Sequence, residues 1–364
     1  MSMTVSWEVV KLTLAQRSAG ILAAALLAFS LAAQTAAQFH PGKVWLDTAG
    51  KPIQAHGGGI LFHDGIYYWY GEDKTLGNLN KTGISCYSSR DFYGWKHEGV
   101  VLPKTAMPED FRDSGVVERP KVIYNAGTGK FVKWMHLDDR LYSVASAGVA
   151  TADTPTGPFH FLRSFRPVHY DFGYPMIDRT HQAEMGSTFR DMNLFVDDDG
   201  LAYVFYAAEG NPTMYVARLN ADFTGVETPA VQGATWQRIL VNQSREAPAP
   251  FQYRGKYYLI SSGTTGWNPN PASYAVADHI FGPWTVKGNP CVGTGAETTF
   301  DSQSTYVLPV PGKEAFVYMG DRWLKDNLAD SRYVWLPFRI REDGSFSLSW
   351  RDEWNLADFL RAPQ

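Results

Sequence analysis

The chain has 364 residues, 45% of them hydrophobic and 14% aromatic, which supplies a large core and excludes a disordered protein. Its formal net charge is −4, so no basic field favours nucleic acid as a partner.

The first 37 residues have the composition of a secretory signal peptide. Lys11 and Arg17 precede an uncharged apolar run over 19–33, and small residues lead to a predicted cleavage after Ala37. The apolar run is shorter than the roughly 20 residues that cross a bilayer, so we predict cleavage rather than anchoring. We therefore expect a secreted or periplasmic protein that does not associate with a membrane once 1–37 is removed.

Residues 38–364 repeat one pattern. Each copy is a predicted strand, a glycine-containing turn and a second strand, and most copies are followed by a further strand pair, the last over 337–350. The hairpins lie at 60–72, 122–136, 194–208, 250–263 and 306–320. Repeats of this size are typical of radial arrays. We predict an all-β protein, a five-bladed β-propeller of four strands per blade in a single domain; a β-sandwich would not require five similar hairpins.

The hairpin glycines place five polar residues in matching positions. Counting back nine residues from Gly65, Gly127, Gly200, Gly255 and Gly312 gives His56, Glu118, Asp191, Glu246 and Gln303. Each begins an otherwise apolar first strand, and first strands line the channel of a propeller. We expect the five side chains to converge at one end of that channel. Converging carboxylates must be solvated, paired or shifted in pKa, which is typical of functional sites.

This set of residues suits hydrolysis of a glycosidic bond. One carboxyl group of raised pKa protonates the leaving oxygen, while a group on the other side activates water or attacks directly. Glu246 is followed by apolar Ala247 and Pro248, which favours a proton-holding carboxyl and hence a general acid. Asp191 would raise the pKa of Glu246 by repulsion and hold a sugar hydroxyl.

Five segments, 54–74, 118–125, 190–200, 245–251 and 302–307, resemble glycoside hydrolase family 43, most closely its exo-β-1,3-galactanase branch. The resemblance implies a five-bladed propeller, inversion of configuration and a polysaccharide substrate. It also implies that Glu246 is the general acid and Asp191 the residue that modulates its pKa.

The first-blade position departs from the family pattern, which usually has an aspartate base there. This chain has His56 and Gly57. The galactanase branch also lacks that aspartate, and the resemblance implies that Gln303 takes its part, as an unusual tautomer or by positioning water. Glu118 is the next candidate for the base, and His56 the last.

Further residues are candidates for sugar contact. Glu72 is expected just beyond the second strand of the first repeat and would bond a sugar hydroxyl, with a surface acid as the alternative. Aromatic faces stack on pyranose rings, so four aromatic residues are candidate platforms, although most aromatics in a propeller pack between blades. They are Tyr142, Trp267, Trp323 and Tyr333. His56 is also counted among the candidate substrate-binding residues.

We expect no metal and no other cofactor. The "DDDG" run at 197–200 is interpreted as a hairpin turn, because it lacks the further spaced ligands of a calcium loop. The family resemblance allows a calcium ion in the channel, but nothing in the sequence identifies its ligands. Export would permit Cys86 and Cys291 to pair, and two buried free thiols are the equal alternative.

The predicted function is that of an exported, exo-acting β-1,3-galactanase acting as a monomer on arabinogalactan-type polysaccharide. An α-L-arabinofuranosidase or β-xylosidase is the alternative enzyme, disfavoured by the missing first-blade aspartate. A non-catalytic carbohydrate-binding propeller is the alternative from another class.

Overall fold

The computed structural model describes residues 37–79, 82–113, 115–169 and 188–360. The predicted signal peptide therefore lies outside the described residues, except for Ala37. Within the described part of the chain, no helix is both long and apolar enough to cross a membrane. The account below concerns the unit His40–Gln364.

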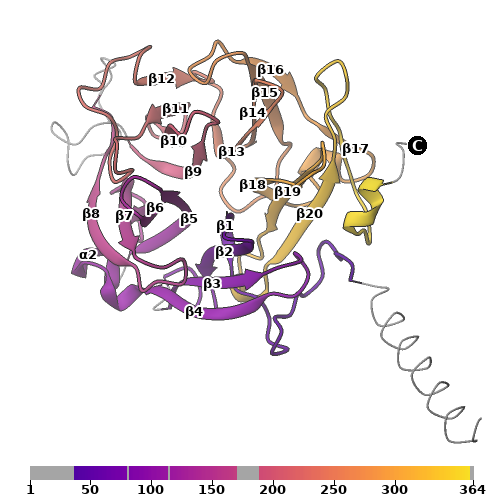
Figure 1. Ribbon diagram of the computed structural model, residues 1–364, viewed down its shortest axis with the longest axis horizontal. Coiled ribbons are helices and arrows are strands. Elements are labelled where there is room, and N and C mark those ends of the chain that lie inside the picture. Colours follow the sequence, from indigo (N-terminus) through magenta and orange to yellow (C-terminus); the bar gives the residue numbers. More distant parts are fainter. Residues whose placement is uncertain (1–36, 80–81, 114, 170–187, 361–364) are drawn as a thin grey trace, which may run out of the picture. The chain divides into compact units, whose positions relative to one another are not determined.

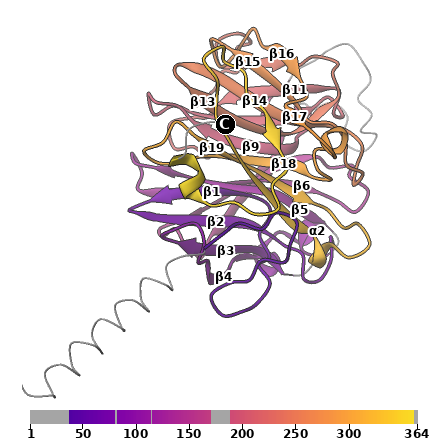
Figure 2. The ribbon, with the colours of Figure 1, turned by 90° about the vertical axis from the view of Figure 1, so that its right-hand side faces the viewer.

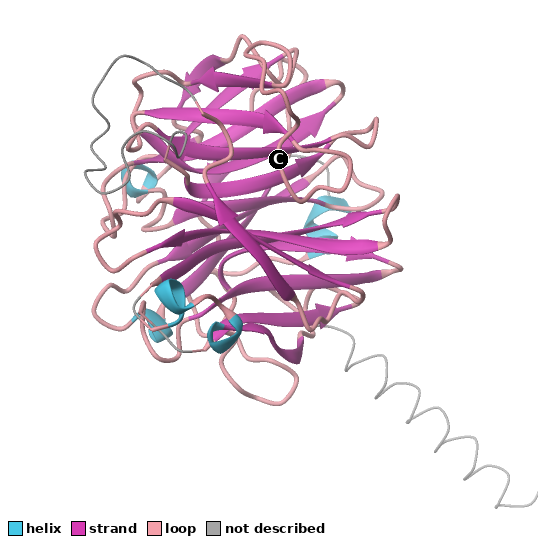
Figure 3. Cartoon of the chain, turned by 90° about the vertical axis from the view of Figure 1, so that its left-hand side faces the viewer, coloured by secondary structure: helices cyan, strands magenta, loops and turns pink. Residues whose placement is uncertain are grey.

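Nearly all regular structure in this unit is strand, and the short helical segments lie in connections (Figure 3). Blade one contains β1 (His56–His63), β2 (Ile66–Asp73), β3 (Gly83–Ser89) and β4 (Lys96–Pro103), and blade two contains β5 (Val116–Asn125), β6 (Lys130–Asp138), β7 (Ser146–Ala152) and β8 (His160–Phe165). Blade three contains β9 (Arg190–Val196), β10 (Ala202–Ala208), β11 (Thr213–Arg218) and β12 (Trp236–Ile239), and blade four contains β13 (Arg245–Tyr253), β14 (Lys256–Gly263), β15 (Ser273–Ala277) and β16 (Thr285–Gly288). Blade five contains β18 (Gln303–Pro309), β19 (Phe316–Arg322) and β20 (Arg332–Phe338). The remaining elements are β17 (Cys291–Val292), β21 (Leu348–Ser349), α2 (Glu109–Arg112) and the 3-10 turns η1 (Lys104–Ala106), η2 (Ala296–Thr298), η3 (Leu328–Asp330) and η4 (Leu356–Leu360).

The five sheets form the predicted β-propeller (Figure 1). The first strands of neighbouring blades contact one another in a closed circle: β1, β5, β9, β13, β18 and again β1. Figure 2 shows the same sheets from the side. The closed circle places the first strands around a central channel, as the sequence pattern predicts.

Blade five differs from the prediction of four strands. After β20 the chain turns at Arg341–Gly344, and Leu348 then pairs in parallel with Cys291 rather than beside β20. Phe346 and Leu348 are buried in the cluster that joins blades four and five. Burial of these two side chains therefore directs the segment away from the edge of β20, and the expected strand pair at 337–350 does not form.

Each first strand carries a β-bulge at the start of its ladder. In blade two, Glu118 pairs with His136 and Lys121 with Trp134, so three steps on β5 match two on β6. The same extra residue occurs in the other four blades. In four blades the residue at the bulge has a left-handed φ, between 37° and 57°. Bulges re-aim side chains next to functional sites.

Side chains on the first strands donate to carbonyl groups in the bulge regions of other blades, four times to a neighbouring blade and once, from Arg119, across the channel. The bonds run from Lys121 Nζ to Gly57 O (2.8 Å), Thr305 Oγ1 to Gly58 O (2.7 Å), Ser304 Oγ to Ala247 O (2.7 Å), Asn193 Nδ2 to Pro248 O (2.9 Å) and Arg119 Nη1 to Ser304 O (3.0 Å). They join the blades across the channel and satisfy buried acceptors that the irregular ladders leave open.

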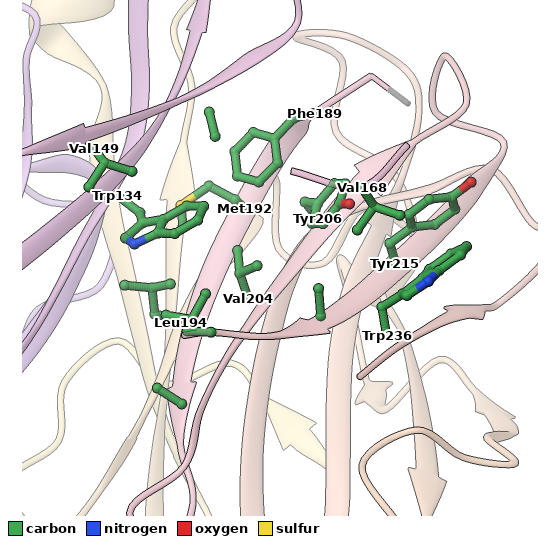
Figure 4. Close-up of a cluster of buried hydrophobic side chains, with 14 of the residues drawn as sticks. Trp134, Val149, Val168, Phe189, Met192, Leu194, Val204, Tyr206, Tyr215 and Trp236 are labelled. Carbon is green, nitrogen blue, oxygen red and sulfur yellow. The ribbon is translucent and has the colours of Figure 1, made fainter. Parts of the chain in front are cut away.

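The core lies between adjacent blades. Between blades two and three, Trp134 and Val149 pack against Met192, Leu194 and Val204 (Figure 4). Both cysteines are buried and free, so Cys86 and Cys291 do not form a disulfide. Burial raises the pKa of each thiol to about 12, which makes both unreactive at neutral pH.

Candidate active site

A cavity of about 420 Å³ lies where the bulged ends of the first strands meet. Eight of the ten residues predicted from the sequence line it: Glu72, Glu118, Tyr142, Asp191, Glu246, Trp267, Gln303 and Trp323. The other described residues of the lining are Arg119, His136, Arg190, Asn211, Thr264 and Gly266. The predicted convergence therefore occurs for four of the five matching positions, and two of the ten predicted residues are exceptions.

The two exceptions are His56 and Tyr333, which are buried beneath the cavity instead of lining it. His56 is 0% exposed, stacks on Tyr333 with ring centroids 4.9 Å apart, and has Nδ1 3.2 Å from Asp321. Tyr333 is 3% exposed and donates its hydroxyl to Ile53 O. The expectation that either contacts sugar is wrong, because packing between blades one and five takes up both rings. The same burial removes His56 as a candidate base.

Asp191 reaches the cavity from a different position than the count of nine implies. Glu118 and Glu246 are each the last paired residue before the bulge of their own first strand. In blade three the residue at that position is Arg190, which pairs with β10. Asp191 is the bulge residue, with φ 37°, and corresponds to Arg119 and Ala247. The loop between β9 and β10 covers 197–201 and is longer than the two-residue turns of blades one and four, which shifts the count by one.

Glu246 is a carboxyl group kept from water. It is 8% exposed, Oε1 accepts a hydrogen bond from Gln303 Nε2 (3.1 Å), and Oε2 accepts one from Asn211 Nδ2 (3.2 Å). Burial raises the pKa of Glu246 to about 8, the charge of Asp191 adds to the rise, and the charge of Arg119 opposes it. Glu246 is therefore largely protonated at neutral pH, as a general acid must be.

Arg119 is the principal site residue that the sequence analysis did not identify. Its Nη2 lies 3.2 Å from Asp191 Oδ2 and also donates to Gln303 Oε1. Its main-chain N–H donates to Glu72 Oε1 (2.9 Å). The bulge aims the guanidinium into the channel, where it joins Asp191 and Gln303, while the main chain of Arg119 binds Glu72 of a third blade.

The orientation of the Gln303 amide follows from its neighbours. Its Oε1 accepts from Arg119 and from Trp323 Nε1 (3.0 Å), and both of these groups can only donate. Nε2 therefore faces Glu246 and Ser262 Oγ (3.0 Å). Gln303 touches the acid itself, whereas an inverting base stands roughly 6.5–9.5 Å away to leave room for water. This contact favours a role in holding the acid over a role as the base.

Glu118 and Glu72 are both buried acids with fixed partners. Burial alone would raise the pKa of Glu118, but the ion pair with His136, the charge of Lys74 and the hydrogen bond from Tyr142 hold it at about 2. Burial raises the pKa of Glu72, although Lys74 Nζ lies 2.5 Å from its Oε2. Glu72 is therefore a cavity residue and not the surface acid of the alternative interpretation. Gly57 leaves room for it, since a Cβ there would lie 2.1 Å from Glu72 Oε1.

Three potential metal ligands lie together in the cavity wall. Ligand atoms of Glu118, His136 and Asp191 are all within 4.8 Å of one another. However, both ring nitrogens of His136 already face carboxylates, Glu118 at 3.3 Å and Asp138 at 3.0 Å, so neither nitrogen is open toward a shared ion. Asp191 already pairs with Arg119. We therefore do not assign a metal to this group.

Trp267 and Trp323 form an aromatic corner of the cavity, with ring centroids 5.4 Å apart and planes at 79°. Both are partly exposed, which suits a sugar platform. Tyr142 contributes its hydroxyl, which donates to Glu118 Oε1 (2.6 Å).

A propeller with a proton-holding carboxyl beside ionised carboxylates at its channel mouth has the equipment of a glycoside hydrolase. Residues 59–344 match glycosyl hydrolases family 43, and the chain belongs to this family. A family 43 β-1,3-galactosidase, solved with galactodeoxynojirimycin, is 42% identical with a TM-score of 0.79, over 87% of this chain and 100% of that one.

Two further solved structures are exo-β-1,3-galactanases. The one from Clostridium thermocellum is 38% identical with a TM-score of 0.76, over 87% of this chain and 66% of that one. The one from Phanerochaete chrysosporium, solved with galactose, is 34% identical with a TM-score of 0.76, over 88% of this chain and 68% of that one.

A curated relative has a different activity. The arabinoxylan arabinofuranohydrolase of Paenibacillus polymyxa is 31% identical over an alignment of 262 residues that covers 63% of this chain and 37% of that protein. The chain thus spans little more than a third of that relative's length.

Proposed function

We propose that the chain is an inverting, exo-acting β-1,3-galactanase that releases galactose from arabinogalactan-type polysaccharide. The observation that carries the proposal is Glu246, a buried carboxyl group in the cavity with a pKa of about 8. The choice of galactan rests on the solved β-1,3-galactosidase and exo-β-1,3-galactanases, which are 34–42% identical to the chain.

In the proposed reaction, Glu246 gives its proton to the oxygen of the leaving galactosyl residue. Asp191 keeps that proton in place by raising the pKa of Glu246, and Arg119 holds Asp191 at 3.2 Å. Water attacks the anomeric carbon from the other face of the ring. Glu118, the ionised carboxylate on the cavity wall, orients this water and takes its proton as the new bond to the anomeric carbon forms, and Gln303 holds the acid.

The sequence of 1–37 supports export, so we propose a secreted or periplasmic location and action as a monomer. Comparison of the culture or periplasmic fraction with the cell extract, followed by size-exclusion chromatography of the mature chain, tests both points.

An arabinofuranosidase is the second candidate, favoured by the 31% identity to the arabinofuranohydrolase. Purified protein incubated separately with β-1,3-, β-1,4- and β-1,6-galactobiose and with arabinoxylan separates the two. Galactose from the β-1,3-linked dimer alone supports the proposal. Arabinose from arabinoxylan, with intact galactobioses, supports the second candidate, and binding to galactan without product supports a non-catalytic module.

A further inference from the structure

Both carboxylate oxygens of Glu118 contact groups that are in turn held in place by one buried aspartate, Asp138. Oε1 accepts from the Tyr142 hydroxyl at 2.6 Å, and Oε2 lies 3.3 Å from His136 Nδ1. His136 is directly opposite Glu118 in the β5–β6 ladder, so the contact is fixed by the register of the sheet. Asp138 is two residues further along β6 and is 0% exposed.

Asp138 holds both His136 and the loop that carries Tyr142. Its Oδ2 is 3.0 Å from His136 Nε2, and its Oδ1 accepts the main-chain N–H groups of Asp139, Val144 and Ala145 at 2.7–3.0 Å. Those three bonds wrap the 139–145 loop around the carboxylate. A carboxylate with three N–H donors on one oxygen is strongly held in its ionised form.

The wrapped loop presents Tyr142 in an unusual conformation. Tyr142 has φ 56° and Ala145 has φ 44°, both in the left-handed region. Arg190 closes the network, since its Nη2 donates to Tyr142 O at 2.5 Å and its Nε lies 3.4 Å from Asp138 Oδ2. A left-handed backbone conformation in a residue other than glycine costs free energy and needs stabilising contacts. Here the hydrogen bonds to Asp138 and from Arg190 supply them.

We propose that His136 and Asp138 are positioning residues that hold Glu118 in its carboxylate form and aim it into the cavity, with His136 acting as a buried imidazolium. This inference rests on the proposed function, because it assigns the groups that prepare one residue of that site. His136 was not among the candidate residues, and the inference assigns it the role of keeping Glu118 ionised.

The charges around His136 support this assignment. Among the described residues, the acids that face it are Glu118 on β5, Asp138 on β6 and Asp191 on β9, while Arg190 contacts Asp138 and the charge of Lys74 acts on Glu118. Tyr142 lies beside the imidazole, with ring centroids 6.2 Å apart, and β7 contributes only Ala147 opposite. Burial would lower the pKa of His136, but Asp138 and Glu118 raise it to about 9.

The first experiment uses the unmodified chain. Nitrogen NMR of the labelled histidine rings, assigned by comparison with His136→Gln, is expected to show both ring nitrogens of His136 protonated at neutral pH. A neutral His136 ring would overturn the inference. The NMR measurement needs no substrate, so its result does not depend on whether galactan is hydrolysed. Absence of galactan hydrolysis would contradict the proposed function and not this inference.

The second experiment measures kcat/KM against pH for His136→Gln, with β-1,3-galactobiose as substrate. Loss of the imidazolium removes the main support of the low pKa of Glu118, so the acid limb of the profile is expected to move up by about one pH unit or more. Tyr142→Phe removes only the hydrogen bond to Glu118 Oε1, so it is expected to move the acid limb of the profile in the same direction by a smaller amount. His279→Gln, at an exposed position, serves as the matched control and should leave the profile unchanged. A folded His136→Gln protein with the wild-type acid limb would contradict the inference.

Discussion

Gln303 donates its side-chain amide to the carboxyl group of Glu246 at 3.1 Å, and Arg119 and Trp323 fix the amide by donating to its oxygen. The contact joins blades four and five at the channel mouth. It makes Gln303 a holder of the acid, because its oxygen already accepts two hydrogen bonds and its nitrogen carries the protons.

Replacement of Gln303 by alanine is expected to lower kcat about tenfold, the equivalent of roughly 1.4 kcal/mol in the barrier, because the acid loses one support. A general base would account for a loss of about 10²–10⁴. Steady-state kinetics with β-1,3-galactobiose distinguish the two. A loss in the larger range would assign Gln303 as the base, and unchanged kcat would remove it from the reaction.

The pH dependence of the reaction should report the proton on Glu246. The pKa of this carboxyl group is raised to about 8, and the acid works only when protonated, so kcat/KM is expected to fall as the pH rises through about 8. Asp191→Asn removes a charge that raises this pKa and should move the fall to lower pH. Asp278→Asn, at an exposed residue with a surface partner, is the matched control. A shift to higher pH in Asp191→Asn would contradict this electrostatic assignment.

Arg119 should matter for stability as well as for activity. Arg119→Met leaves Asp191 without its buried cationic partner and removes one of the two donors to the oxygen of Gln303, and breaking such a buried pair typically destabilises by about 3–5 kcal/mol. Urea unfolding followed by tryptophan fluorescence measures this change. The exposed Arg254–Glu314 pair provides the comparison, since Arg254→Met should change the free energy of unfolding by about 1 kcal/mol or less. Equal effects of the two substitutions would argue against the central role of Arg119.

The aromatic corner should affect binding more than turnover. Trp267→Ala is expected to raise KM about tenfold, which corresponds to roughly 1.4 kcal/mol, with little change in kcat, because it removes a platform and no reacting group. Trp267→Phe should recover part of the loss. Trp323→Phe keeps a ring but removes the hydrogen bond to Gln303, so its effect should fall on kcat. A Trp267→Ala variant that lowers kcat alone would show that the ring does not act as a platform.

Much of the fold could be predicted from the sequence because each blade repeats the same hairpin. Turn glycines and alternating apolar residues are local signals, so the first two strands of every blade were predicted correctly. The last segment was not, because Phe346 and Leu348 are drawn into the core between blades four and five, and that preference depends on contacts with residues far away in the sequence.

The candidate site shows the same division. Glu118, Glu246 and Gln303 were found by counting from the turns, and Asp191 was found although it lies at the bulge and not at the matching position. Arg119 was missed because its side chain reaches the cavity only through the β-bulge, and a bulge cannot be recognised from one sequence. Tyr333 was misassigned because an exposed aromatic and one packed between blades have the same sequence signature.

The most direct test of the account is the release of galactose from linear β-1,3-galactan by the wild-type chain and by Glu246→Gln, followed by proton NMR of the anomeric signals. The account predicts that the wild type releases galactose first as the α-anomer, and that the variant is slower by about 10²–10⁴ because it has no proton to give. Absence of galactose from the wild type, or equal release by the variant, would contradict it.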